Sequence, residues 1–153
     1  TNPGTPLVDI NRFIDNPPKS RNEILSSLMR RLKMCEELGS GWDRIALECE
    51  LKQIPAPKIQ LYEENTKVTV FAELPFSSIP HEDKLWTCYL HACLKQITHE
   101  GLTNSSLRQR FGLEEKSAAP ISRLIKEAVE KELIKPFDAN TAPKHMKYVP
   151  SWA

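Results

Sequence analysis

Basic and hydroxyl side chains recur through the last third of the chain, and both types can donate hydrogen bonds to phosphate oxygens. An arginine can also read a guanine edge with two parallel bonds. We therefore predict one nucleic-acid-facing surface that gathers Arg108, Arg110, Ser117, Ser122, Arg123, Lys126, Lys144 and Lys147. Arg123 is a candidate for base or phosphate contact, and Lys126 for phosphate contact. The alternative for all of these residues is an ordinary solvated surface.

Two glycine-bearing turns in the first third are a second candidate site. Gly39, Ser40 and Gly41 precede an expected helix, and backbone N–H groups at such a turn can approach a phosphate. The sequence contains neither a G-x-x-x-x-G-K-[ST] run nor a G-x-G-x-x-G run, so a P-loop is excluded. The triplet is also typical of a helix C-cap and turn, and the Asn2–Gly4 segment is typical of a turn.

The cysteines and histidines predict neither a metal site nor a catalytic group. None of the four cysteines forms a C-x-x-C pair, and the four histidines are scattered without a serine and carboxylate at recognisable spacing. We expect Cys88 and Cys93 to be reduced core residues of a cytosolic protein.

Composition restricts the class of protein further. Of 153 residues, 40% are apolar and 27% charged, which is typical of a globular chain. No apolar run approaches the roughly 18 residues of a membrane span, and no N-terminal leader is recognisable. Residues 1–83 carry 10 basic and 13 acidic side chains, net −3, whereas residues 84–153 carry 11 and 7, net +4. A basic second half favours contact with a phosphate backbone.

The elements that would position the basic residues follow from apolar periodicity and turn residues in the second half. Thr103 or Asn104 is the expected N-cap of the short second helix, and Ser117 that of the third. The pattern predicts helices near 83–98, 103–111 and 117–133, followed by strands at 133–136 and 147–149. This order is that of a winged helix-turn-helix, in which the third helix enters the major groove of duplex DNA. A protein-docking or dimerisation module is the alternative interpretation.

The first half predicts two helices and a β-hairpin. Ser20 is the expected N-cap of a helix that begins near Arg21 and has a continuous apolar stripe. A second helix is expected over 42–51 with Ile45 and Cys49 facing the core, and strands over 58–62 and 67–73. We place a domain boundary in 74–80, which gives an α+β chain with domains 1–80 and 81–153. The stripe of the first helix consists of Ile24, Leu25, Leu28, Leu32 and Cys35.

Ordered motifs give the chain a family resemblance. The segments are 1–7, 12–15, 20–23, 37–41 and 51–57 in the first half, and 108–113, 122–126, 133–136 and 148–153 in the second. The chain resembles the C-terminal part of the RecG-related ATP-dependent DNA helicase and predicted transcriptional regulator family. Proteins of that family resemble a Schlafen/Alba-type domain followed by a GHKL-like ATPase segment, and a winged helix often closes them.

The resemblance implies a partial nucleotide site in residues 1–80. The turns would border a nucleotide-like pocket, with an Arg-Asn pair at the start of the helix between them; the residues are Asn2, Gly4, Arg21, Asn22, Gly39, Ser40 and Gly41. ATP and Mg²⁺ would belong to a longer protein, and the chain itself carries no helicase motor motif. Duplex DNA is the expected partner in a setting of transcription regulation, with a homodimer as a further expectation. The remaining alternative is that the chain is a regulatory fragment that responds to a nucleotide.

Overall fold

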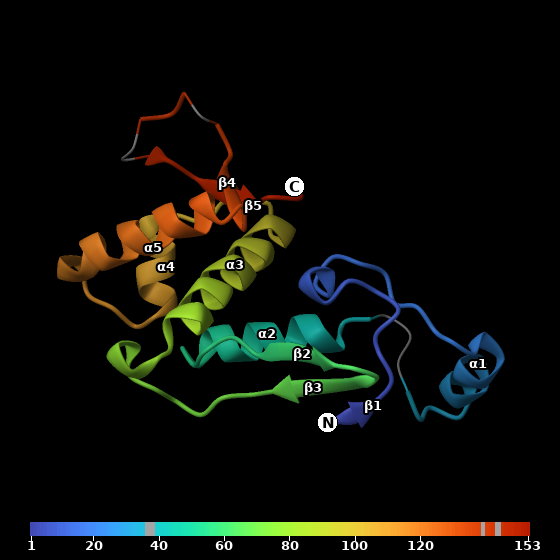
Figure 1. Ribbon diagram of the computed structural model, residues 1–153. Coiled ribbons are helices and arrows are strands. Elements are labelled where there is room, and N and C mark those ends of the chain that lie inside the picture. Colours follow the sequence, from blue (N-terminus) through green and yellow to red (C-terminus); the bar gives the residue numbers. More distant parts are fainter. Residues whose placement is uncertain (36–38, 139, 143–144) are drawn as a thin grey trace.

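The computed structural model describes residues 1–35, 39–138, 140–142 and 145–153 (Figure 1). This part of the chain forms five α-helices and two small antiparallel sheets, so the expected α+β class is confirmed. The helices are α1 (Glu23–Arg31), α2 (Gly41–Leu51), α3 (His81–Ile97), α4 (Asn104–Arg110) and α5 (Ala118–Glu130). The strands are β1 (Asn2–Pro3), β2 (Lys58–Tyr62), β3 (Asn65–Thr69), β4 (Ile134–Pro136) and β5 (Tyr148–Pro150).

Helix α3 lies at the centre of the molecule and contacts α2, α4, α5 and β5. Nine of its residues are buried, which is more than one apolar stripe supplies. Neighbours on several sides therefore cover it, and even the polar Thr87 and His91 are excluded from water. Ile97, expected on the buried face, is exposed in the last turn, where those neighbours no longer reach. Other members of the core are Leu102, Leu107, Ile121, Leu124, Ile125, Ala128 and Ile134.

The N-terminal sheet has the strand order β1-β3-β2, and all its pairs are antiparallel. Strand β2 spans the expected residues, but β3 begins at Asn65 and ends at Thr69, whereas we expected 67–73. The pairing of Tyr62 with Asn65 leaves a two-residue turn, and Glu63 adopts a φ of 50° there. Two-residue hairpin turns commonly need positive φ angles because their twist must match that of the strands.

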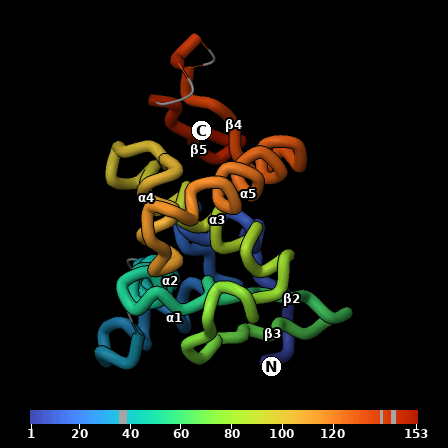
Figure 2. Tube along the Cα trace, turned by 90° about the vertical axis from the view of Figure 1, so that its left-hand side faces the viewer, coloured from blue at the N-terminus to red at the C-terminus, as the bar shows by residue number. Residues whose placement is uncertain are grey.

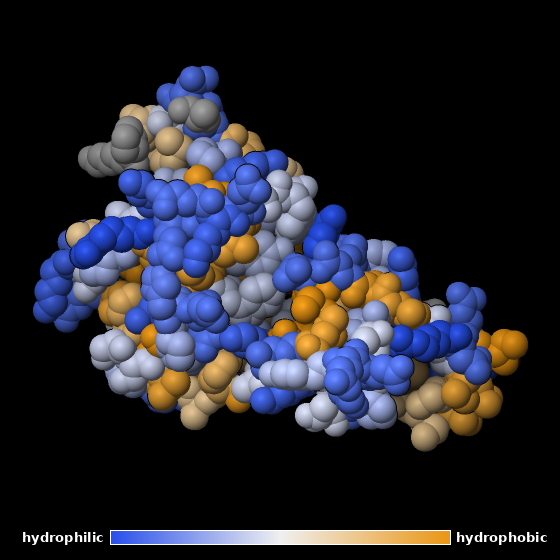
Figure 3. Space-filling view, viewed as in Figure 1, coloured by the Kyte–Doolittle hydropathy of each residue, from blue (hydrophilic) through white to orange (hydrophobic). Residues whose placement is uncertain are grey.

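Helix α1 presents its apolar stripe to solvent. Its N-cap is Asn22, whose side chain accepts a hydrogen bond from the Leu25 amide; the expected cap, Ser20, instead bonds the Asn22 amide. Ile24 is 86% exposed, and Leu28 is 53% exposed. Apolar residues gather in Figure 3 over the end of the molecule where α1 lies, as the exposed Leu25, Leu32 and Met34 indicate. Periodicity therefore predicted the stripe correctly, but no described element covers it.

Helix α2 packs on α3 through Ala46 and Cys49. The expectation that Ile45 also faces the core is wrong, since this side chain is exposed and the buried position is the next residue along. The apolar pattern of α2 alone does not specify which of its residues α3 covers.

The second half contains a helix, a short helix, a third helix and a two-stranded sheet, in the expected order. Strands β4 and β5 lie within one residue of the expected ranges. Figures 1 and 2 agree that β4 and β5 lie at the opposite end of the molecule from α1. The division at residue 80 remains a prediction; Ile14, Ala46 and Ala56 from the first half join the same buried cluster as α3.

Candidate nucleic-acid interface

A capping box fixes the start of α4. The Ser106 amide donates to Thr103 Oγ1 over 3.1 Å, and the Thr103 amide donates to Ser106 Oγ over 3.0 Å. Two N–H groups that a helix start would leave unpaired are satisfied in this way. The prediction that Thr103 or Asn104 caps this helix is confirmed for Thr103, and the following turn of α4 is held in place.

Asn104 joins α4 to the first turns of α5 and orients an arginine. Its Nδ2 donates to the Ala118 carbonyl over 3.0 Å and to Ser122 Oγ over 2.9 Å. Its Oδ1 accepts from Arg108 Nε over 3.0 Å. Because one amide serves both helices, Arg108 and Ser122 are set at a defined separation. Asn104 was predicted only as a possible cap, and its bridging role depends on a tertiary contact that the sequence does not reveal.

The outer face of α5 carries exposed polar side chains, while its apolar residues enter the core. Ser122, Arg123 and Lys126 are exposed. Lys126 Nζ lies 3.8 Å from Glu130 Oε1, a contact between two exposed groups that contributes little. Ser117 precedes α5 at the N-cap position but makes no capping hydrogen bond, contrary to expectation. The opposite face of α5 is formed by Ile121, Leu124, Ile125 and Ala128.

Contacts with His81 and Lys131 occupy the carboxylate of one acidic residue of α5, Glu127. Glu127 accepts from His81 Nε2 over 2.8 Å and lies 3.0 Å from Lys131 Nζ. The hydrogen bond from His81, followed by that from Lys131, lowers the pKa of the Glu127 carboxyl. The positive face of α5 is therefore less diluted by this glutamate than its position in the sequence indicates.

A hollow of about 470 Å³ lies between α4, α5 and the segment that leads into β5. Three of the predicted DNA-contacting residues line it together: Arg108 from α4, Ser122 from α5 and Lys147 before β5. Gly101 makes room for this segment, since a Cβ there would lie 2.7 Å from Lys147 Cβ. Three residues separated by up to 39 positions in sequence thus share one surface. Lys144 lies outside the described residues, and Arg123 and Lys126 do not line the hollow.

Arg110 lies away from that surface, which corrects its expected placement. It is only 5% exposed, and its Nη2 donates to the Ile54 carbonyl over 2.6 Å. Its Nε lies 3.7 Å from Glu50 Oε2, and Nη1 has no hydrogen-bond partner among the described residues. Burial lowers the pKa of the guanidinium, an effect that the charge of Glu50 opposes. Two positions along a helix turn a side chain by about 200°, so Arg108 and Arg110 must face different ways.

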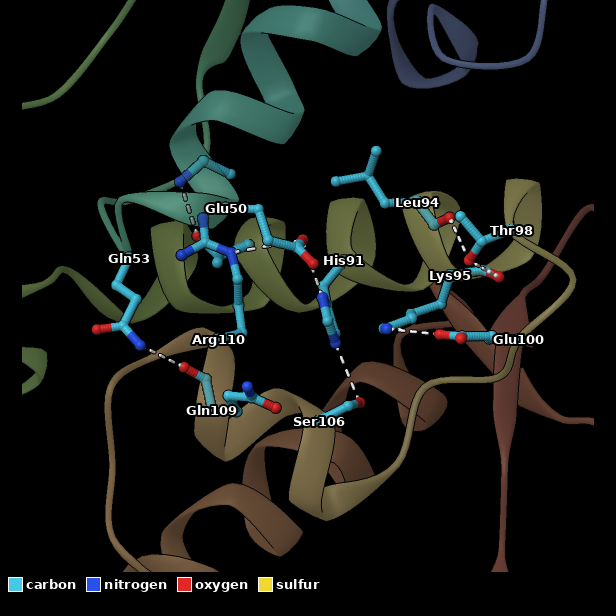
Figure 4. A network of polar contacts seen from close by, with 12 residues as sticks. Glu50, Gln53, His91, Leu94, Lys95, Thr98, Glu100, Ser106, Gln109 and Arg110 are labelled. Atoms are coloured by element: carbon cyan, nitrogen blue, oxygen red, sulfur yellow. Dashed lines mark hydrogen bonds and ion pairs between the residues drawn. The ribbon is translucent and has the colours of Figure 1, made fainter.

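Glu50, His91 and Ser106 form a polar chain beside Arg110 (Figure 4). His91 Nδ1 lies 2.9 Å from Glu50 Oε2, and its Nε2 lies 3.0 Å from Ser106 Oγ. A serine, a histidine and a carboxylate in this order resemble the arrangement of a hydrolase. However, Ser106 Oγ also bonds the N–H and C=O of Thr103, and His91 is buried. The chain therefore acts as a polar link between α2, α3 and α4. Sequence spacing gave no signal for it.

The residues expected at a nucleotide site lie in two groups in the first half. The side chain of Arg21 lies beside Thr5 and Gly4. Its Nη2 donates to the Thr5 carbonyl, and a Cβ at Gly4 would lie 3.8 Å from its Nη1. Asn2 is in β1 beside them, and Asn22 caps α1. Gly39 adopts a φ of 67°, and a Cβ there would lie 2.9 Å from Pro18 Cδ, so this position requires glycine. Ser40 and Gly41 begin α2.

Comparison with known proteins identifies the first half only. Residues 1–70 match the family model described as "Putative ATP-dependent DNA helicase recG C-terminal". This region is therefore similar to the RecG-related family, as the motifs in the first half suggested. The match does not extend to α3–β5. No curated protein and no solved structure matches the chain significantly.

No group of three or more His, Cys, Asp or Glu side chains is arranged to hold a metal ion in the described part of the chain. None of the described helices combines the length and the apolar character that crossing a membrane requires.

Proposed function

We propose that residues 81–153 form a winged helix-turn-helix that binds duplex DNA, in a protein that regulates transcription. The observation that carries this proposal is the convergence of Arg108, Ser122 and Lys147 on one hollow from three separate elements. The order of elements and the contacts of α3, α4 and α5 with one another support it. The family description of the first half, which names a DNA helicase, favours a nucleic-acid setting.

In this proposal α5 approaches the major groove with its first turns. Arg123 is exposed there and can donate two bonds to a guanine or to a phosphate. Lys126, one turn later, contacts the phosphate backbone, and Arg108 and Lys147 do so from the flanking elements. No metal ion or cofactor is needed for this binding.

The test is fluorescence anisotropy of a labelled duplex with the 153-residue chain, between about 50 and 200 mM salt. We expect affinity to fall steeply with salt, and the slope of log K against log salt to decrease by about 0.9 for each phosphate contact removed. Arg123→Ala combined with Lys126→Ala should weaken binding at every salt concentration. Lys67→Ala, an exposed cation on β3, is the matched control and should leave binding unchanged.

Absence of duplex binding at low salt would refute the proposal and would leave a protein-docking role for α3–β5. Equal losses in the α5 double variant and in Lys67→Ala would show that the affinity is a non-specific charge effect.

A nucleotide-responsive role for residues 1–80 is the second candidate, because the matching family is named for an ATP-dependent protein. Addition of ATP and Mg²⁺ should then shift amide resonances of Gly39–Trp42 and of Arg21. Shifts confined to other regions, or none at millimolar nucleotide, would remove this candidate.

A further inference from the structure

The lining of the 470 Å³ hollow is chemically divided. Ile125, Met146 and Tyr148 contribute apolar surface to the hollow, and its other lining residues are polar. The volume is within the roughly 300–1,000 Å³ range of small-ligand sites. A phosphate contact on an open helix face needs no such enclosure. The hollow therefore has room for more than one phosphate oxygen.

Three of the polar residues that line the hollow offer hydrogen-bond donors. Arg108 uses only Nε within the described part of the chain, to Asn104 Oδ1, so both terminal nitrogens remain available. Ser122 Oγ accepts from Asn104 Nδ2 and keeps its own proton for another acceptor. Lys147 adds an exposed ammonium. Of the described residues that line the hollow, none is acidic.

The apolar side is held rigidly. The amide and the carbonyl of Tyr148 each exchange a 2.8 Å hydrogen bond with Leu102, and Tyr148 also pairs with Pro136 across β4 and β5. An aromatic residue fixed in this way can support a base, since stacking on aromatic side chains accepts any base. Ile125 is buried in α5 and supplies a second apolar contact.

We propose that this hollow binds one unstacked nucleotide of a single-stranded stretch adjoining the duplex. Its phosphate bonds Arg108, Ser122 and Lys147, and its base lies against Tyr148, Ile125 and Met146. A base inside a duplex cannot enter, because it is paired and stacked on both faces. This inference rests on the proposed function and adds a preference for a duplex that ends in an unpaired strand.

The experiment compares two labelled DNAs with the 153-residue chain at one salt concentration. One is a blunt duplex, and the other carries an unpaired extension but has the same number of phosphates. We expect at least tenfold tighter binding of the extended DNA. Arg108→Ala and Ser122→Phe, which remove a cation of the hollow and fill it, should abolish this preference. Lys126→Ala, outside the hollow, should weaken both DNAs by the same factor.

The outcomes separate the inference from the proposed function. Equal affinity for the two DNAs would overturn the inference and leave duplex binding intact. Absence of binding to either DNA would overturn both. A preference that survives Arg108→Ala and Ser122→Phe in folded variants, checked by circular dichroism, would also refute the role of the hollow.

A second measurement covers the case in which Ser122→Phe does not fold. Titration of the unmodified chain with thymidine 5′-monophosphate should shift the amides of Thr103–Ser105, Ser122 and Tyr148 in a heteronuclear NMR spectrum. Inorganic phosphate should shift the amides near Arg108 and Lys147, but only the nucleotide should also shift the aromatic ring resonances of Tyr148. Identical responses to both probes would indicate a simple anion site and would overturn the assignment of the base.

Discussion

Helices α1 and α5 have similar amphipathic patterns but very different surroundings. Ile121, Leu124 and Ile125 of α5 are buried between α3 and α4, whereas Ile24 and Leu28 of α1 are exposed. The least exposed positions of α1 include Ser26 and Ser27, and its leucines face away from them. An apolar stripe therefore records that a face is suited to burial, but it does not specify which element covers that face.

The largest expected difference between the exposed region around α1 and the buried region around α3 and α5 is in thiol reactivity. Burial raises the pKa of Cys88 and of Cys93 to about 12, so very few of these thiols are ionised at pH 8. Cys35, after α1, is exposed, and Cys49 is buried with a pKa raised chiefly by burial. We expect Cys35 to react with a disulfide reagent at least about 1,000-fold faster than Cys88 and Cys93, and faster than Cys49.

Mass spectrometry of the labelled peptides would identify the fast thiol, and the same assay in denaturant should give four equal rates. Rapid labelling of Cys88 or Cys93 in the folded chain would show that α3 opens readily. The contrast between the regions would then be wrong.

A matched pair of leucines tests the same contrast in stability. Leu107 is 0% exposed, whereas Leu28 is 53% exposed. Leu107→Ala leaves a cavity and should lower the free energy of unfolding by about 3 kcal/mol. Leu28→Ala should change it by no more than about 0.5 kcal/mol, because alanine is as good a helix former and little buried area is lost. Urea titration followed by circular dichroism measures both, and similar losses would mean that α1 is covered in solution.

Sequence patterns predicted helices, caps and strands well because each of these depends on residues that are close together in the chain. The stripe of α1, the cap at Thr103 and the range of β2 each depend on residues a few positions apart. Three of the expected DNA-contacting residues also proved to be neighbours, because the order of elements limits how helices and strands can pack.

Tertiary contacts account for what the sequence did not predict. Arg110 was grouped with Arg108 because both are basic. Helix geometry already separates their directions by about 200°, but which of the two is buried depends on the tertiary contacts of Arg110 with Ile54 and Glu50. Asn104 and His91 acquire their roles from partners 14 to 41 residues away. The exposure of α1 was also beyond prediction, since periodicity contains no information about the covering element.

The smallest of the three effects concerns one of the contacts that join the first half of the chain to the second. Arg110→Ala removes the hydrogen bond to the Ile54 carbonyl and leaves Glu50 with one cationic neighbour fewer. Hydrogen bonds to charged groups contribute about 2 kcal/mol, and we expect a loss of that size in the free energy of unfolding. Arg108→Ala, two residues earlier on the same helix, should cost no more than about 0.5 kcal/mol but should weaken DNA binding.

Arg110→Ala is thus expected to change stability, whereas Arg108→Ala is expected to change the affinity for DNA. Amide shifts in Arg110→Ala should spread to Ile54 and Glu50 on the far side of the contact, while those of Arg108→Ala should stay on α4 and α5. If Arg110→Ala left stability unchanged, the network around Glu50 and His91 would not couple the regions. The first half would then be attached to α3 by the packing of Ala46 and Ala56 and by hydrogen bonds such as that from Trp86 Nε1 to the Pro57 carbonyl.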